Sequence, residues 1–196
     1  MTDSTTTSVL IVDDEESVVQ LFRQWLKDDY DVHTALNGDE ALEILEGDPI
    51  DVVLLDRRMP GLSGDEVLET INEEGMDCKV AMVTAVDPGL EVIEMGFDDY
   101  VVKPPSREEL HQTIENLLER GEHSERQQEY WSLLSKREVL RDKMSESELE
   151  ESDEYAELKT QIAELRDEIE ATQERMGEDV EFLTTLRHIE NGSEST

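Results

Sequence analysis

Apolar residues alternate between short continuous runs and helical spacing through the first 120 residues. The runs predict β-strands over residues 9–12, 30–35, 52–55, 79–83 and 100–102. Apolar positions three and four apart predict helices from about residue 17, then over 39–45, 65–74 and 90–95, and after 106. Ser106 and Glu109 form a capping box at the start of the last helix. Five strands alternating with five helices predict a parallel sheet covered on both faces.

The third strand ends at an aspartate. Val52–Leu55 is apolar without alternation, which is typical of a strand buried on both faces. Asp56 follows, and residues 57–61 (RRMPG) contain proline and glycine, so the chain must leave the sheet there. A carboxylate at the carboxyl end of a central parallel strand stands where open α/β sheets have their sites.

Polar residues that suit phosphate chemistry follow the other strands. Asp13 and Asp14 follow the first strand, Thr84 ends the fourth, and Lys103 follows the fifth. These carboxylates repel one another unless they are neutralised, and Mg2+ is a hard cation that takes oxygen ligands. Lysine and hydroxyl groups suit phosphoryl oxygens, and Asp56 can be a covalent nucleophile. The acids alone fit ordinary acidic turns and Thr84 alone fits a local cap, but that interpretation weakens when all five residues stand at the ends of four of the five predicted strands.

Four segments around these residues resemble the receiver domains of two-component response regulators. They are residues 9–15 (VLIVDDE), 53–61 (VLLDRRMPG), 82–85 (MVTA) and 98–104 (DDYVVKP). The resemblance implies a doubly wound, flavodoxin-like α/β domain over residues 9–119. It also implies that the phosphohistidine of a sensor histidine kinase donates to Asp56. Such a protein is not an enzyme in the ordinary sense, but a phosphoacceptor that assists its own phosphorylation and dephosphorylation.

The resemblance also implies roles for the neighbouring residues. Mg2+ would be held by Asp14, Asp56 and the backbone carbonyl of Arg58, with Asp13 contacting it through water. Lys103 would contact the phosphoryl group, and the peptide bond from Lys103 to the following proline would be cis.

A switch is implied as well. Thr84 would move toward the phosphoryl group and Tyr100 would turn inward, although Tyr100 also fits an ordinary half-buried strand tyrosine. The surface formed by the fourth helix, fifth strand and fifth helix would change with them, as a shift between two populations.

Arg57 and Arg58 depart from the family pattern, which has an apolar residue after the phosphoacceptor. One interpretation is that both arginines pair with neighbouring acids. The other is that they tune the lifetime of the phosphoryl group, Arg58 by shielding it.

The last third of the chain predicts a small all-α domain. An amphipathic helix starts near Tyr130, and an acidic turn over 145–153 interrupts it, with Ser152 as a helix cap. Spacings of three and four then indicate the seam of a packed helix pair, and a short third helix is expected over 180–189. The seam residues are Tyr155, Leu158, Ile162, Leu165 and Ile169. We therefore expect an antiparallel helical hairpin with a short closing helix.

The boundaries follow from these patterns. Residues 1–8 are expected to be a disordered tail, 120–128 a linker or extended helix, 129–191 the helical domain, and 192–196 a frayed tail.

This domain resembles HalX, an output domain attached to receivers in haloarchaea, through residues 130–137 (YWSLLSKR), 147–150 (SELE) and 154 onward. The resemblance implies an output to transcription, so DNA or transcription machinery are expected partners. A module for protein interaction or homodimerisation without DNA contact is the alternative. An aspartyl-phosphate phosphatase is disfavoured, because Arg58 stands where such hydrolases need a second aspartate.

One basic cluster offers a candidate DNA contact, although its members could equally pair with acids on a solvated helix. At about five phosphate contacts, a rise from 0.2 to 4 M salt would cost on the order of six decades of affinity. At 4 M salt, contacts from basic residues to phosphates could therefore not account for DNA binding. The cluster consists of Lys136, Arg137, Arg141 and Lys143.

The composition bears on the environment. The chain has 52 acidic and 17 basic residues and a net charge of −35. Disordered acidic tails could explain this, but apolar periodicity continues through most of the chain, so we favour a halophilic protein whose repulsion is screened by molar salt. The single cysteine excludes an internal disulfide framework, and no signal or membrane-spanning pattern is present. A cytoplasmic location without membrane contact is expected.

Overall fold

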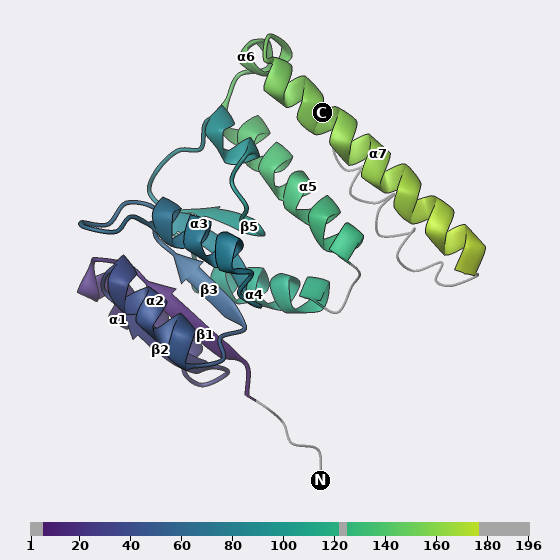
Figure 1. Ribbon diagram of the computed structural model, residues 1–196. Helices are drawn as coiled ribbons and strands as arrows, with labels where there is room; N and C mark the ends of the chain where they lie inside the picture. Colours follow the sequence, from purple (N-terminus) through teal and green to yellow (C-terminus); the bar gives the residue numbers. More distant parts are fainter. Residues whose placement is uncertain (1–5, 122–124, 177–196) are drawn as a thin grey trace.

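The computed structural model of the protein describes residues 6–121 and 125–176 (Figure 1). The predicted third helix of the last domain, over residues 180–189, lies outside the described residues, as do the tail at 192–196 and most of the tail at 1–8.

A five-stranded parallel sheet forms the first domain, with strand order β2-β1-β3-β4-β5. The order places β1 and β3, which lead to Asp13 and Asp56, side by side in register, with Val12 opposite Leu55. The strands are β1 (Ser8–Val12), β2 (Asp31–Ala35), β3 (Val52–Leu55), β4 (Lys79–Thr84) and β5 (Asp99–Val102). The predicted doubly wound α/β class is confirmed.

Helices cover both faces of the sheet. On one face α1 (Glu16–Leu26) and α4 (Arg107–Gly121) pack over alternate strand residues. On the other face lie α2 (Gly38–Gly47), α3 (Gly64–Glu74) and the short 3-10 helix η1 (Leu90–Ile93). Because consecutive strand residues point to opposite faces, the continuous apolar runs are needed to fill both cores.

The largest departure from the sequence expectation is η1. A helix was predicted over residues 90–95, but only four residues form a 3-10 turn. The stretch has few residues between Gly89 and Gly96, and Gly96 packs so closely on Asn72 that a Cβ atom there would meet its side-chain nitrogen at 2.4 Å. The chain therefore crosses the end of α3 with little room for a full α-helix.

The second domain is a helical hairpin of α5 (Glu125–Lys143) and α7 (Asp153–Met176), joined by α6 (Glu146–Glu150). Ser152 caps α7, as predicted, by accepting a hydrogen bond from the Tyr155 backbone at 3.0 Å. All five predicted seam residues are buried. Ser145 and Glu148 form a capping box on α6, which was not predicted as a helix.

The hairpin packs against the sheet domain. The helix α5 contacts β5, η1 and α4, and α7 contacts α5 and η1 (Figure 1). Phe97 and Tyr100 from the first domain belong to the same buried cluster as Tyr130 and Leu133 from α5. The two domains therefore share one hydrophobic core along this side. None of the described helices is long and apolar enough to cross a bilayer.

Candidate functional site

Two aspartates share one lysine at the carboxyl edge of the sheet. Lys103 Nζ lies 2.8 Å from Asp56 Oδ1 and also donates to Asp13 Oδ2. Asp13 and Asp56 are only 2% and 6% exposed, and their backbone N–H groups continue the sheet by donating to Ala35 O and Val12 O. Neighbouring strands thus hold two carboxylates close together, and the residue after β5 supplies their common cation.

Burial and charge set the protonation of this group. Burial raises the pKa of Asp13, and its hydrogen bonds from Lys103 and from the Glu15 backbone only partly oppose that effect. Burial alone would lower the pKa of Lys103, but hydrogen bonds to Asp13 and Asp56 outweigh it and raise the pKa. Lys103 therefore stays cationic at neutral pH.

An open pocket lies beside this group. Asp14, Asp56, Arg58, Thr84 and Lys103 are among its lining residues, so the predicted site residues from four strand ends are brought together. Thr84 is 1% exposed, and its hydroxyl oxygen accepts a bond from Val86 N at 3.3 Å, which leaves the hydroxyl proton for another acceptor. Asp14, in contrast, is exposed to solvent.

The start of α3 approaches the Asp56 backbone very closely. Gly64 N donates to Arg57 O at 3.0 Å, and a Cβ atom on Gly64 would lie 2.0 Å from Asp56 O. Only glycine fits here. This contact fixes the loop that carries Arg57 and Arg58 as it leaves the sheet.

The two arginines lie in different surroundings. Arg57 is 11% exposed in its side chain, and its guanidinium bridges Asp65 on α3 and Glu91 on η1, both at 3.0 Å. Burial alone would lower the pKa of Arg57, but the hydrogen bonds that its guanidinium donates to both carboxylates outweigh burial and raise the pKa. Arg58 is exposed and lines the pocket, with its backbone N–H donating to Asp56 Oδ2 at 2.9 Å. Of the two interpretations that the sequence left open for these arginines, pairing with neighbouring acids describes Arg57.

Tyr100 is buried rather than half-buried. It is 5% exposed, its hydroxyl donates to Val86 O at 2.8 Å, and its ring packs on Phe97 with centroids 5.5 Å apart. Tyr100 thus occupies an inward position, bonded to the loop that follows Thr84. The Lys103–Pro104 peptide bond is cis, as the resemblance implied.

The comparisons agree with this geometry. The family model described as "Response regulator receiver domain" matches residues 9–115, which is more than half of the chain. The chain belongs to the response regulator receiver family. A second family model, described as "HalX domain", matches residues 119–186.

Curated relatives support the assignment. A protein of Haloferax volcanii named as a transcriptional regulator is 45% identical over 164 residues, covering 83% of this chain and 28% of that protein. The alkaline phosphatase synthesis transcriptional regulatory protein PhoP of Bacillus subtilis is 37% identical over 118 residues, covering 58% of this chain and 49% of that protein. The chain therefore spans about a quarter to a half of the length of these relatives.

Solved structures match the receiver part. The response regulator protein TrrA from Thermotoga maritima, in complex with Mg2+–BeF, has a TM-score of 0.52 and 34% identity, covering 57% of this chain and 98% of that chain. A CheY-like receiver domain from Methanospirillum hungatei has a TM-score of 0.57 and 28% identity, covering 60% and 98%.

The receiver's donor set fits a magnesium ion. Within the described residues there is no ready-made cluster of three or more His, Cys, Asp or Glu ligands. Mg2+ does not need one, because it usually keeps several waters and binds through one or two carboxylates. Asp14 and Asp56 line one pocket and offer hard oxygen ligands, with Asp13 next to them.

The structure corrects one expectation for the basic cluster on α5. Lys136 is only 6% exposed, because its ammonium group is buried against the receiver and donates to Ile93 O at 3.0 Å. In this arrangement it is not accessible to a DNA phosphate. The other three pair with acids at 2.9 to 3.8 Å: Arg137 and Arg141 with Glu138, and Lys143 with Asp87 and Asp142.

Two groups of contacts were not foreseen from the sequence. Asp65 and Glu91 were not singled out as partners of Arg57, and α5 residues Ser132 and Ser135 were not expected to bond to the receiver. The only signal for the latter is their place among apolar residues on one face of a helix.

Proposed function

We propose that the protein is a phosphorelay response regulator that accepts a phosphoryl group on Asp56 from a sensor histidine kinase and signals through its HalX domain to transcription. The observation that carries the proposal is the shared ion pair of Lys103 with Asp13 and Asp56 at the edge of the sheet. It places the buried Asp56 carboxylate beside a fixed cation, and an aspartyl carboxylate can act as a covalent nucleophile.

The chemistry follows from the positions of the side chains. An Asp56 carboxylate oxygen forms a bond to phosphorus while the bond from phosphorus to the kinase histidine nitrogen breaks, and that electron pair returns to the imidazole. Lys103 neutralises charge on the phosphoryl oxygens, and the Thr84 hydroxyl donates to one of them. In dephosphorylation a water oxygen forms a bond to phosphorus while the bond from phosphorus to the Asp56 oxygen breaks, which restores the Asp56 carboxylate and releases inorganic phosphate.

Magnesium belongs to the proposal. Asp14, Asp56 and the backbone carbonyl of Arg58 would hold Mg2+, with Asp13 contacting it through water. Bound Mg2+ supplies the positive charge that two or three neighbouring carboxylates and a phosphoryl group together require.

The output is proposed to be transcription, since the relatives of Haloferax volcanii and Bacillus subtilis carry names of transcriptional regulators. The target of the HalX domain can be DNA or a protein of the transcription machinery. Pairing of Arg137, Arg141 and Lys143 with acids favours a protein partner or a second copy of the chain as the alternative. A shift assay at molar KCl, with and without beryllofluoride and Mg2+, distinguishes DNA contact from protein contact.

Labelling tests the phosphoacceptor directly. In molar KCl with Mg2+, acetyl phosphate carrying labelled phosphorus should label the wild-type protein and leave the Asp56→Asn variant unlabelled. In cells, promoter occupancy that depends on phosphorylation should fall in the Asp56→Asn strain. Equal labelling of both proteins would disprove the assignment of Asp56.

A further inference from the structure

The docked helix α5 holds one segment of the receiver through three polar side chains. Ser132 Oγ donates to Phe97 O at 2.6 Å, Ser135 Oγ to Asp99 Oδ1 at 2.5 Å, and Lys136 Nζ to Ile93 O at 3.0 Å. Positions 132, 135 and 136 are three and four residues apart, so they lie on one face of the helix. We call these three residues the α5 clamp.

The clamp residue Lys136 makes a second contact with the receiver. Its ammonium group also lies 5.5 Å from the centre of the Phe97 ring. A buried lysine that meets a carbonyl oxygen and an aromatic face keeps part of the stabilisation that water would give it. Phe97 is therefore contacted by two clamp residues, by Ser132 at its carbonyl oxygen and by Lys136 at its ring.

The clamped segment leads directly into Tyr100. The Asp99 oxygen that accepts from Ser135 also accepts from the Tyr100 backbone N–H at 2.9 Å. The ring of Phe97 packs against the ring of Tyr100. The position of Tyr100 is thus fixed on its backbone side and on its ring by groups that the clamp holds.

Tyr100 in turn holds the loop next to the phosphoacceptor pocket. Its hydroxyl donates to Val86 O, and Val86 N donates to the Thr84 hydroxyl oxygen. Thr84 and Val86 line the pocket that also contains Asp56 and Lys103. Because Val86 N occupies a lone pair of the Thr84 hydroxyl, the hydroxyl proton is turned to other acceptors, including a phosphoryl oxygen on Asp56.

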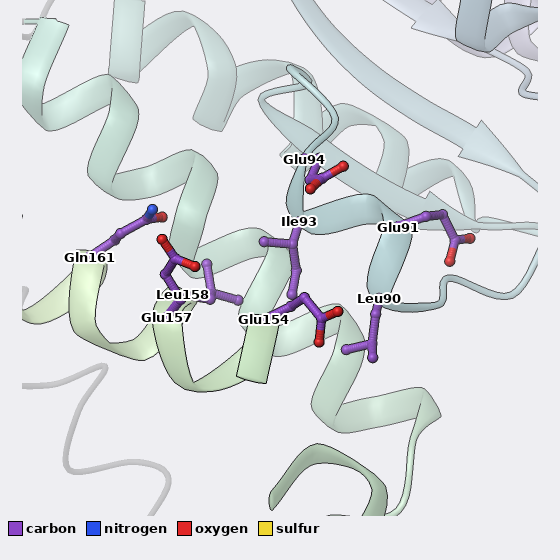
Figure 2. Close-up of a pocket in the computed structure, with 8 residues that line it drawn as sticks. All are labelled: Leu90, Glu91, Ile93, Glu94, Glu154, Glu157, Leu158 and Gln161. Carbon is purple, nitrogen blue, oxygen red and sulfur yellow. The ribbon is translucent and has the colours of Figure 1, made fainter. Parts of the chain in front are cut away.

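The other helix of the hairpin, α7, contacts the receiver at η1. Between η1 and α7 lies a pocket in which Ile93 and Leu158 extend toward each other, with carboxylates around them (Figure 2). The carboxylates are Glu91, Glu94, Glu154 and Glu157. The three hydrogen bonds of the clamp, from Ser132, Ser135 and Lys136 to residues 93–99, come from α5.

We propose that the α5 clamp, acting through Tyr100, positions the Thr84 hydroxyl for a phosphoryl group on Asp56, so that the docked HalX domain stabilises the phosphorylated receiver. The inference rests on the proposed function. Docking should stabilise rather than destabilise the phosphorylated receiver, because a Thr84 hydroxyl that is already positioned loses little conformational freedom when the phosphoryl group arrives. Coupling of this kind is reciprocal, so phosphorylation also tightens the docking of α5.

Beryllofluoride with Mg2+ tests the coupling, because it is a stable mimic of the phosphoryl group. Its affinity is measured by calorimetry in molar KCl for the full chain and for the Ser135→Ala/Lys136→Met variant. Methionine keeps the buried volume of Lys136 but removes its hydrogen bond. We expect the variant to bind beryllofluoride about 5- to 10-fold more weakly, in the usual range for coupled sites.

A matched lysine provides the control. Lys159 lies over the Tyr155 ring at 5.2 Å within α7, is exposed, and has no contact with the receiver among its described interactions. The Lys159→Met variant should bind beryllofluoride as the wild type does. Lys136→Arg, which keeps a donor, should recover part of the affinity, and the melting temperature measured without beryllofluoride identifies any variant that has lost its fold.

The reciprocal measurement is hydrogen exchange on the wild-type protein. Beryllofluoride and Mg2+ should slow exchange of backbone amides over residues 93–100 and 130–140 as well as around Asp56. If the folded double variant binds beryllofluoride as tightly as the wild type, the clamp has no positioning role. If the wild type binds none, or the Asp56→Asn variant binds equally, the proposed function fails instead. Where the double variant does not fold, Ser135→Ala alone is compared with the wild type by the same criterion.

Discussion

The Lys103 ammonium group lies 2.8 Å from Asp56 Oδ1 and also bonds to Asp13, so one cation serves two buried carboxylates. The Lys103 side chain is 14% exposed, and the carboxylates are still less exposed. Removing a partner from a buried ion pair leaves an uncompensated charge in a poorly solvated place. The stability of this edge of the sheet therefore depends on Lys103 or on a replacement cation.

We expect the Lys103→Met variant to melt roughly 6 to 20 °C below the wild type in Mg2+-free molar KCl, from a loss of about 3 to 5 kcal/mol. Adding Mg2+ should raise the melting temperature of the variant more than that of the wild type, because the metal ion supplies the missing charge. Lys27→Met, on an exposed lysine, is the control. Equal responses of the variant and the wild type to Mg2+ would contradict a metal site at these carboxylates.

Arg57 joins two elements on either side of the phosphoacceptor loop. Its Nε atom lies 3.0 Å from Asp65 Oδ1 on α3, and its Nη1 atom lies 3.0 Å from Glu91 Oε1 on η1. Lysine has one nitrogen and cannot reproduce a fork that spans two carboxylates. Since the carboxylates are partly exposed, the Arg57→Lys variant should lose only about 1 kcal/mol of unfolding free energy in urea titrations at fixed KCl.

Arg23→Lys, on the exposed side of α1, is the matched control for Arg57→Lys and should leave the urea midpoint unchanged. A loss of the same size in both variants would mean that the fork of Arg57 contributes nothing of its own.

The strand ends could be predicted from sequence because a parallel sheet has only one carboxyl edge. Asp13, Asp56 and Lys103 each follow an apolar run that forms a strand. Because the strands are parallel, all three residues lie at the same edge of the sheet, regardless of the helices between the strands. The seam of α7 was predictable for a similar reason, because Leu158, Ile162 and the others repeat at helical spacing. Local pattern alone is enough in both cases.

The docking of the two domains could not be predicted in this way. Ser132 and Ser135 are small polar residues that a sequence pattern assigns to a surface, and their acceptors, Phe97 O and Asp99 Oδ1, are 35 and 36 residues away. Lys136 was expected on an exposed basic face, yet it is buried against Ile93 and Phe97. Such contacts depend on tertiary arrangement rather than on period or propensity.

The buried Lys136 should make stability depend on pH. Burial lowers its pKa below the ordinary value of 10.5, only partly offset by the charges of Asp98 and Glu129. Between the lowered pKa of the folded state and 10.5, Lys136 is more protonated in the unfolded chain than in the folded one. The contribution of Lys136 to the free energy of unfolding therefore rises with pH in this window. The difference in melting temperature between wild type and Lys136→Met, measured from pH 7 to 10, should shift in favour of the wild type as pH rises. A pH-independent difference would contradict the lowered pKa.

Salt should act on the contact between η1 and α7. Glu94 and Glu157 lie on opposite sides of the pocket in Figure 2, in a chain whose net charge is −35. The Debye length grows from about 3 Å at 1 M to about 10 Å at 0.1 M, so dilution exposes these carboxylates to one another. We expect the melting temperature to fall between 3 M and 0.1 M KCl, and to fall less in the Glu94→Gln/Glu157→Gln variant.

The pair Glu73→Gln/Glu74→Gln controls for net charge, since it removes the same two charges from the exposed end of α3. If both double variants show the same salt dependence, general repulsion accounts for it and the pocket has no special part.

Arg58 lines the phosphoacceptor pocket and is exposed to solvent. Its backbone N–H bonds Asp56 Oδ2 at 2.9 Å, and the exposed residue lines the pocket next to Thr84 and Lys103. A long cationic side chain there can obstruct the approach of water to a phosphoryl group on Asp56. The Arg58→Ala variant keeps the backbone bond and removes the side chain, so it should lose labelled phosphate several-fold faster than the wild type after labelling with acetyl phosphate in molar KCl. Arg23→Ala, at an exposed arginine on α1, should keep a lifetime close to that of the wild type. An unchanged rate in Arg58→Ala would remove Arg58 from the control of phosphoryl lifetime.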